Sequence, residues 1–482
     1  ERLGVKHVEQ LYCEAMTDNA YTKQPNDFTQ NIGNGSYSTA DSYVKQVWDG
    51  RYTGIRMCNQ LLENIDRVPD LDPELKKRYI GEAKVLRAYS YYELYTKFGD
   101  IPYTTKVLSI KESMSIARTA KATVIANVLA DLDEVINGNY LPTSYDADNK
   151  GRITRWAAMA IKAKIYLFEG NWTQVKNITS TIMTEGGFKL FGSYAGLFEI
   201  ANEYNSEVIL DAQYRPTSRE HQMMYVFLPP TLGGYSQLSP LQELVDSYIM
   251  LDGKTIKETG TSFDESHPYA NRDPRLKATV MYTGNSYTLA DGTEVVINCE
   301  KGEGKDGYGV GSDCSATGYY IKKYWDNTYR ATLYSGLNPI LIRYADILLM
   351  NAEALAELGE LDKTAWDATI KPIRDRAGFT LASALEFPEG ASKDKLIEIV
   401  RNERRSELAL EGHRHKDIIR WRIADDVLNG WCHGLKTNDV VGTDDGYVRV
   451  ENRTFNANKH YLWPIPQAER DLNGNLEQNP NW

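Results

Sequence analysis

A charged stretch near the C-terminus constrains the fold of this chain more than any other segment. It extends from Lys393 to Trp421 and reads KDKLIEIVRNERRSELALEGHRHKDIIRW. Ser392 is a residue type that caps helix N-termini, and Gly412 can end a helix in the left-handed conformation. We therefore predict a helix over 393–411 whose ends are apolar and whose middle is almost entirely charged.

Like charges recur within this helix at one-turn spacing: Arg401 with Arg405, and Glu403 with Glu407 and Glu411. Each such pair costs about 0.2–0.5 kcal/mol in an isolated helix. We therefore predict that the stripes meet opposite charges on neighbouring elements and clamp the scaffold together. The alternatives are a solvated face, and a catalytic carboxylate pair, which would also need a cleft. The candidate partners are Arg414, Arg420 and Arg422.

The same stretch resembles the signature of the SusD/RagB family, the glycan-capturing lipoproteins on the surface of some Gram-negative bacteria. Three further segments, 82–103, 343–354 and 461–482, resemble other blocks of that family. The resemblance therefore extends from near residue 40 to the last residue. The residues that match the signature are Arg401, Glu403, Arg404, Glu407, Leu408, Glu411, Gly412, Arg414, Asp417, Ile418, Arg420 and Trp421.

The fold that this resemblance implies is mainly α, one SusD-like unit over 1–482. Tetratricopeptide-like helix pairs over 1–185 and 338–482 would form a scaffold. A large irregular insertion of loops and small hairpins, 186–337, would pack on it and carry much of the ligand site.

Helical periodicity and breakers place the scaffold helices independently of the resemblance. In the insertion the periodicity fades, and short strand-like segments alternate with Gly, Pro and Asn clusters. The predicted helices are 3–16, 41–68, 73–98, 122–136, 154–169, 172–184, 241–250, a segment beginning at 338, and 362–377. The predicted strands are 208–212, 277–282, 294–298 and 319–324.

Charge and apolar run length narrow the possible partners. The net charge of −11 argues against nucleic acid, whose phosphates attract basic patches. No apolar run approaches the ~20 residues of a membrane-spanning helix.

The chain opens on ERLGVKHVEQLY, which already reads as a helix. We therefore expect an export signal and a lipid-bearing cysteine upstream of residue 1.

Motifs for metal, redox or catalytic chemistry are weak. The five cysteines include no CxxC pair; Cys299 and Cys314 flank a Gly-rich loop and could form a disulfide, although the odd total argues against a full framework. His413 and His415 would need further ligands to hold a metal. No G-x-S-x-G or H-E-x-x-H motif occurs. We therefore expect no cofactor and no catalytic residues.

Aromatic residues in loops are the remaining candidates for a binding site. The chain has 32 Tyr against 11 Phe, and tyrosine combines a flat ring with a polar tip. Two regions, 17–40 and 281–330, combine aromatics with Asn, Asp and Arg, and similar proteins bind glycans with aromatics from these two regions. Ordinary packing is the alternative for each. The candidate ligand-binding residues are Trp325, Tyr308, Tyr282, Tyr287, Tyr37, Phe28, Asn327 and Asp326.

The resemblance implies a function without catalysis. The protein would bind oligosaccharide or polysaccharide at the cell surface, held by an N-terminal lipid anchor in the outer membrane. It would deliver the glycan to a SusC-like TonB-dependent transporter. The alternatives are a helical-repeat scaffold that captures peptide or protein, and an α-helical glycoside hydrolase.

Overall fold

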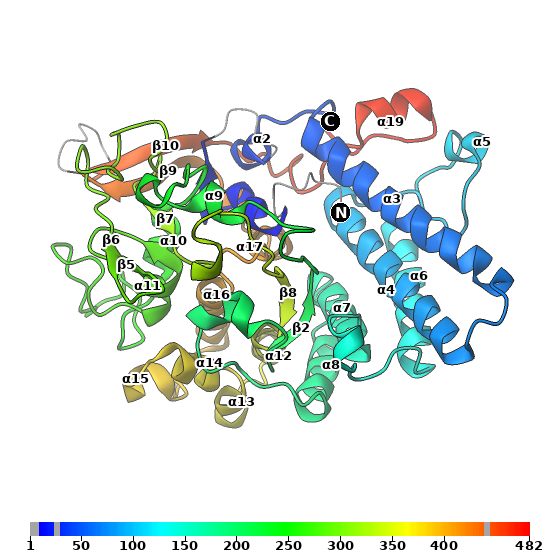
Figure 1. The fold of residues 1–482 in the computed structure, drawn as a ribbon, viewed down its shortest axis with the longest axis horizontal. Helices are drawn as coiled ribbons and strands as arrows, with labels where there is room; N and C mark the ends of the chain where they lie inside the picture. The colour runs from blue at the N-terminus through cyan, green and yellow to red at the C-terminus, as the bar shows by residue number, and fades with distance from the viewer. Residues whose placement is uncertain (1–8, 24–28, 438–443) are drawn as a thin grey trace.

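The computed structural model describes residues 9–23, 29–437 and 444–482, and the fold is mainly α, as predicted (Figure 1). Long helices occupy the right and lower parts of the view, and short strands and turns gather on the left.

The longest helices, α3 (Ser42–Asn64) and α4 (Pro73–Phe98), form the predicted hairpin. Asp41 caps α3 by accepting hydrogen bonds from the backbone N–H groups of Tyr43 and Val44. Asp72 caps α4, and Pro73 occupies its first turn, where a missing N–H costs nothing. Gly99 ends α4 with a φ of 71°. These local signals explain why both predicted ranges are nearly correct.

The other scaffold helices pack in sequence against α4 and then against one another. Small residues allow close approach, since Ala157, Ala160 and Ala163 are fully buried. The predicted helix over 362–377 is interrupted at Thr369, where ψ is −70° and φ is −125°. The helices are α6 (Lys121–Asn137), α7 (Arg155–Phe168), α8 (Trp172–Glu185), α12 (Tyr344–Leu358), α13 (Lys363–Ala368), α14 (Ile370–Ala377) and α16 (Lys393–Glu407).

A strand replaces the start of one predicted helix. The sequence predicts helix from residue 338, but β8 (Ile340–Arg343) is extended and pairs antiparallel with β2 (Val208–Asp211). A short buried apolar segment fits a strand as well as a helix, which explains the error. This pairing joins the 186–337 region to the helical scaffold.

Short elements make up the 186–337 region, and in the described part of the chain every sheet has two strands. The predicted strand over 277–282 is wrong at its start, because Asp273 caps a helix that extends to Thr279. The elements after β2 are α9 (Met223–Phe227), β3 (Leu238–Pro240), α10 (Gln242–Ser247), α11 (Pro274–Thr279), β4 (Val280–Met281), β5 (Ser286–Thr288), β6 (Glu294–Val296) and β7 (Tyr320–Ile321).

The segments near the termini hold further short elements. Strand β9 (Gly430–Lys436) pairs antiparallel with β10 (Tyr447–Arg453) in a part of the sequence that is rich in Gly, Asp and Asn. Short 3-10 turns join several elements. The remaining elements are α1 (Glu9–Tyr12), β1 (Ala20–Thr22), α2 (Gln30–Asn34), α5 (Ile110–Ser113), α15 (Ala382–Leu385), α17 (Arg414–Arg420), α18 (Ala424–Val427), β9 (Gly430–Lys436), β10 (Tyr447–Arg453) and α19 (Gln467–Leu472).

Helix α16 carries three of its charged side chains into the protein interior. Glu403, Arg404 and Glu407 are at most 2% exposed. The helix ends at Glu407, four residues earlier than predicted, and Gly412 does adopt a left-handed φ of 80°.

The charged stripes meet opposite charges on neighbouring elements, as predicted, and we call the set the buried ion network. Several contacts measure 2.6 to 2.9 Å, for example Arg343 with Glu407 and Lys323 with Glu411, and Arg376 also pairs with Glu407. Burial alone would raise the pKa of Glu411, but Arg343 and Lys323 overcome it and hold that pKa at about 2. The network comprises Glu207, Asp273, Arg275, Lys323, Arg343, Arg374, Arg376, Glu403, Glu407 and Glu411.

The partners named from the sequence are wrong. Arg414 pairs with Asp18 at 2.8 Å, and Arg420 with Glu353 at 2.6 Å. Arg422 stacks on the ring of Tyr461. The cations that neutralise the glutamate stripe come instead from distant segments, which local spacing cannot identify.

Candidate ligand-binding surface

The two regions predicted to supply ligand contacts meet in the structure. Strand β1 pairs antiparallel with β3, and the backbone N–H of Lys23 continues the ladder to the carbonyl of Gln237. The Lys23 ammonium then donates to the carbonyls of Ser312 (2.5 Å) and Cys314 (2.8 Å). One lysine therefore joins the 17–40 region to the 281–330 region.

Three tyrosines gather beside this junction, and we call Tyr225, Tyr235 and Tyr334 the tyrosine surface. The rings of Tyr225 and Tyr235 lie 4.3 Å apart at an angle of 51°. Tyr235 is 37% exposed and Tyr334 is 45% exposed. A backbone bridge between His221 and Ser335 brings the segment that carries Tyr334 alongside α9.

The hydroxyl of Tyr225 interacts with its neighbours in this surface. The hydrogen bond to Tyr235 raises the pKa of Tyr225 to about 12, and Tyr334 and Asp313 act in the same direction. Asp313 also interacts electrostatically with Lys23. Exposed rings beside a carboxylate and an ammonium can stack on the C–H face of a sugar and hydrogen-bond its hydroxyls.

Sequence reasoning missed all three tyrosines because they lie outside the two regions it selected. The strongest local signal is at Tyr235, which follows Gly233 and Gly234. Gly233 has a left-handed φ of 86°, so the chain turns there, two residues before the exposed Tyr235.

Several predicted residues pack in the interior. Tyr287 is fully buried and donates its hydroxyl to the Ile321 carbonyl at 2.9 Å. Tyr282 is 9% exposed and stacks on Tyr269, with ring centroids 3.9 Å apart. Tyr308 is half-buried against the same core. In this conformation Tyr287 has no ring face that a ligand could reach.

Trp325, Tyr287 and Asn327 do lie together. The Trp325 ring packs 5.0 Å from that of Tyr287. The Trp325 indole N–H and the Asn327 amide both donate to the Thr288 carbonyl, at 3.1 and 2.8 Å. Asp326 is 5% exposed and accepts from the backbone of Ile200 and Thr328, which fixes a turn. Trp325 and Asn327 remain half-buried at the edge of this cluster.

Of the two candidates from the first region, Tyr37 does not join this cluster. Tyr37 is 4% exposed and packs against Trp482, with ring centroids 4.8 Å apart, and against His460. Phe28 lies outside the described residues.

Cys299 and Cys314 are buried, and His413 and His415 are half-buried. Cys299 and Cys314 form no disulfide, and neither do the other three cysteines, all of which the structure describes. Burial and neighbouring lysines lower the pKa of His413 and of His415 to about 3. Within residues 9–23, 29–437 and 444–482, no group of three or more His, Cys, Asp or Glu side chains could hold a metal ion.

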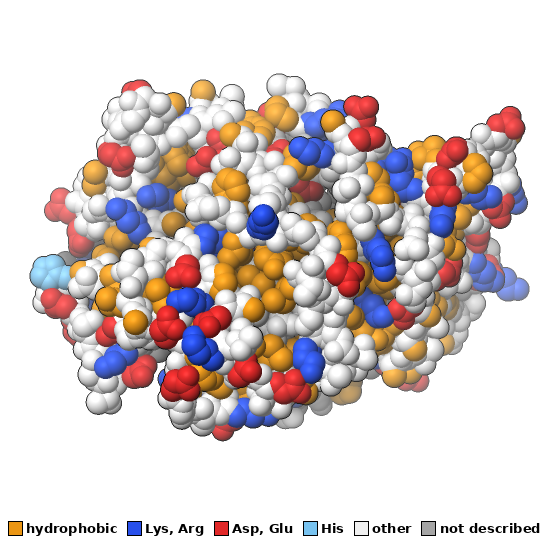
Figure 2. Space-filling model, turned by 90° about the horizontal axis from the view of Figure 1, so that it is seen from below, with side chains coloured by type: hydrophobic (Ala, Val, Ile, Leu, Met, Phe, Trp, Pro, Cys, Tyr) orange, Lys and Arg blue, Asp and Glu red, His pale blue; other side chains and the backbone are white. Residues whose placement is uncertain are grey.

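The molecular surface carries both signs of charge. Figure 2 shows acidic and basic side chains interspersed around hydrophobic ones on one face, with no uniform basic field. Such a surface fits an uncharged partner better than a polyanion. Over the same described ranges, no helix is long and apolar enough to cross a membrane.

Comparison with known proteins identifies the family of this chain. Residues 197–482, more than half of the chain, match the SusD family, and residues 4–167 match a family described as starch-binding associating with outer membrane. A SusD-like protein of Formosa agariphila is 28% identical over 409 residues, 80% of this chain and 71% of that protein.

Solved structures agree with this assignment. A SusD-like carbohydrate binding protein of Bacteroides fragilis superposes with a TM-score of 0.87 at 28% identity, covering 98% of this chain and 93% of that one. A laminarin binding SusD-like protein has the same fold, with a TM-score of 0.73 at 24% identity, covering 98% and 94%. The chain therefore belongs to the SusD family.

Proposed function

We propose that this protein binds a neutral glycan without chemical turnover, at the tyrosine surface. The observation that carries the proposal is the exposure of Tyr235 and Tyr334 at the junction made by Lys23. Stacking on tyrosine gives affinity for a sugar ring, and Asp313 and Lys23 offer polar contacts. The carbohydrate-binding relative in Bacteroides fragilis supports a glycan as the ligand.

The absence of turnover is part of this proposal. The glutamates of the family signature are ion-paired inside the protein, with Glu403, Glu407 and Glu411 at most 2% exposed. A glycosidase needs two carboxyl groups that flank a bound sugar in a cleft. These glutamates therefore support structure rather than hydrolysis.

Affinity electrophoresis in native gels tests the proposal. The gels would contain a panel of neutral polysaccharides that includes starch and laminarin. We expect at least one polysaccharide to retard the wild type, and Tyr235→Ala combined with Tyr334→Ala to lose most of that retardation. Leu381→Ala is a matched control, because Leu381 is 48% exposed. If no polysaccharide slows the protein and calorimetry detects a peptide, the glycan assignment fails. Release of reducing sugar would refute binding without turnover.

The proposal includes a cellular setting. The protein would be lipid-anchored on the outer face of the outer membrane and would pass its glycan to a SusC-like TonB-dependent transporter. The match to a family described as associating with outer membrane supports this placement. Palmitate labelling of the full-length precursor tests the anchor, and co-purification of a TonB-dependent transporter from detergent-solubilised outer membranes tests the partner. Unlabelled precursor or purification without a transporter would contradict the respective part.

A further inference from the structure

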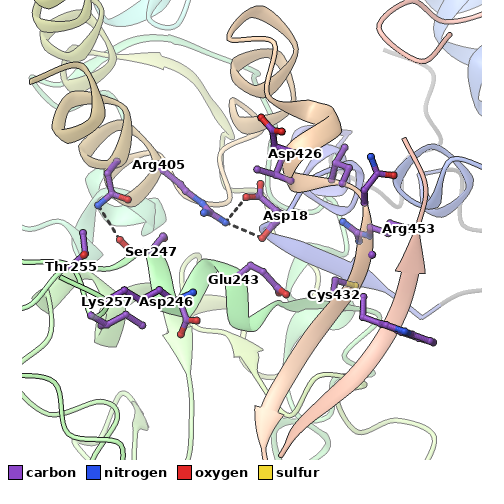
Figure 3. A pocket seen from close by; sticks show the side chains of 17 residues that line it. Asp18, Glu243, Asp246, Ser247, Thr255, Lys257, Arg405, Asp426, Cys432 and Arg453 are labelled. Atoms are coloured by element: carbon purple, nitrogen blue, oxygen red, sulfur yellow. Dashed lines mark hydrogen bonds and ion pairs between the residues drawn. The ribbon is translucent and has the colours of Figure 1, made fainter. Parts of the chain in front are cut away.

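A concave site lies away from the tyrosine surface, and we call it the hairpin cleft. It has a volume of about 520 Å³ and lies between α10, α16, α18 and the β9–β10 hairpin (Figure 3). Ligand pockets typically measure about 300–1,000 Å³. None of Tyr225, Tyr235 and Tyr334 lines it, so the cleft is separate from the site proposed above.

The floor of the cleft is a neutralised ion pair. Arg405 reaches toward Asp18, as Figure 3 shows, with 2.9 Å between its Nη2 and the Asp18 carboxylate. Asp18 also accepts from Arg414 at 2.8 Å, and Arg405 also donates to Asn19 at 2.9 Å. Because Asp18 accepts from both arginines and Arg405 is also bound to Asn19, these ionic groups are already engaged and the floor leaves none of them unpaired for an ionic ligand.

The wall on the α10 side offers hydrogen-bonding groups with spare capacity. Among the described residues Asp246 accepts one hydrogen bond, from the Gln242 amide at 2.7 Å. Burial raises the pKa of Asp246, because its carboxyl group has little contact with water. The Asn402 amide donates to the Ser247 carbonyl at 3.0 Å, which leaves its oxygen as an acceptor. Lys257, at the rim, supplies a donor.

The opposite wall provides an aromatic face. Trp431 on β9 is 43% exposed, although tryptophan has the largest apolar surface of any side chain. The guanidinium of Arg449 lies 5.2 Å from the centre of its ring and holds the indole against the hairpin. An exposed indole that lines the same cleft as a carboxylate and an amide can recognise a sugar: the indole contacts the C–H face and the polar groups bind the hydroxyls.

We infer that the hairpin cleft is a second saccharide site, which takes one or two neutral sugar units. Trp431 would stack on the ring, and Asp246 and Asn402 would accept from its hydroxyls. The inference rests on the proposed function in one respect, since it takes the ligand to be a glycan. Two sites on one protein would let a single polysaccharide chain engage both, which raises its apparent affinity without any new contact.

The test compares four proteins: wild type, Tyr235→Ala with Tyr334→Ala, Trp431→Ala with Asp246→Asn, and Trp431→Phe. The probes are the polysaccharide that retards the wild type and short oligosaccharides cut from it. Calorimetry gives the stoichiometry and affinity for the oligosaccharides, and native gels give the affinity for the polymer. Thermal unfolding checks that each variant is folded. Trp431→Phe is the conservative control, because phenylalanine keeps an aromatic face.

We expect the wild type to bind two oligosaccharides, and each double variant to bind one. The Trp431→Ala, Asp246→Asn protein would lose about ten-fold or more in polymer affinity, whereas Trp431→Phe would retain most of it. If the wild type and the Trp431→Ala, Asp246→Asn protein both bind one oligosaccharide, this inference is overturned and the proposed function stands. If the wild type binds one oligosaccharide and only the Trp431→Ala, Asp246→Asn protein loses it, the cleft is supported and the tyrosine surface is refuted. If no probe binds the wild type, both proposals fail.

Discussion

Arg343 and Glu407 form an ion pair at 2.6 Å between two segments that are 64 residues apart in the chain. Arg343 ends β8 and is 1% exposed, and Glu407 ends α16 and is fully buried. Arg343 also binds Glu207 at 2.7 Å, next to β2. The pair thus connects the signature helix, the helical scaffold and the 186–337 region. A family signature that consists of charged residues is therefore compatible with a structural role.

Removal of either member of this pair is expected to destabilise the fold strongly. Arg343→Met or Glu407→Gln leaves its buried partner without full compensation, which costs about 3–5 kcal/mol. Chemical unfolding monitored by circular dichroism would measure the loss. We expect glycan affinity of the folded fraction to remain at the wild-type level, because the tyrosine surface does not include either residue.

The matched control is Lys363→Ala, which removes ion pairs with Asp367 and Glu386 on the surface. The Lys363 side chain is 55% exposed, and exposed pairs contribute about 0–1 kcal/mol. Equal losses in the control and in Glu407→Gln would contradict the structural role assigned to the buried ion network.

The free energy of unfolding is expected to fall as pH rises above 5, because the buried Glu14 carboxyl group holds a proton in the folded state. Burial raises its pKa from 4.5 to about 7, although Asn19 and the Gly412 N–H oppose that shift. The folded state therefore binds a proton that the unfolded state has already released between these pH values. Its contribution is present below pH 4.5 and is lost as pH rises through 7, at up to about 1.4 kcal/mol per pH unit.

Glu14→Gln tests this linkage, because an amide cannot release that proton. The free energy of unfolding would be measured by urea titration at intervals from pH 5 to 8, for the variant and the wild type. The variant loses one hydrogen bond, so its absolute stability is lower, but the difference between the two proteins should shrink as pH rises. A constant difference would refute the raised pKa.

Truncation of a buried tyrosine is expected to lower stability, whereas truncation of an exposed tyrosine is expected to lower glycan affinity. Tyr287→Ala empties a fully buried position and should cost about 3–5 kcal/mol of stability, since large-to-small core changes leave a cavity. Tyr334→Ala removes a 45% exposed ring and should leave the melting temperature nearly unchanged while it weakens glycan binding. Differential scanning fluorimetry and calorimetry on both variants separate the two roles; weakened binding by folded Tyr287→Ala alone would reverse the assignment.

All five cysteines are expected to carry free thiols. Burial raises the pKa of Cys58 and of Cys432 to about 11, so little reactive thiolate exists at pH 8. Alkylation of the native protein should therefore be slow at these two positions. Alkylation after unfolding without reductant should add five groups by mass, and a shortfall of two would reveal a disulfide.

Helix positions were predictable where local chemistry marks both ends. Asp72, Pro73 and Gly99 define α4 from the sequence alone, because capping and backbone preferences act over a few residues. The segment at Ile340 was misassigned because a buried strand and a buried helix present the same apolar pattern, and only pairing with Val208 distinguishes them.

The site was less predictable than the scaffold, because exposure of a loop aromatic depends on distant contacts. Tyr287 and Tyr334 both occur among turn-forming residues, yet one is buried by the segment at Ile321 and the other faces solvent. The convergence of the two regions was anticipated through the resemblance. The lysine that joins them, Lys23, has no local sequence signal that indicates its partners at 312 and 314.

The pairing of Asp18 with Arg414 spans 396 residues and has a consequence for synthesis of the chain. A ribosome releases the N-terminal partner long before the C-terminal one, so this contact forms only when nearly the whole chain is available. Loop closure over such a distance adds little to the equilibrium cost but delays the step. Until then the Asp18 carboxylate remains exposed to water. The interior around Asp18 is therefore complete only after residue 414 has been synthesised, and a chain truncated before that residue lacks this partner of Asp18.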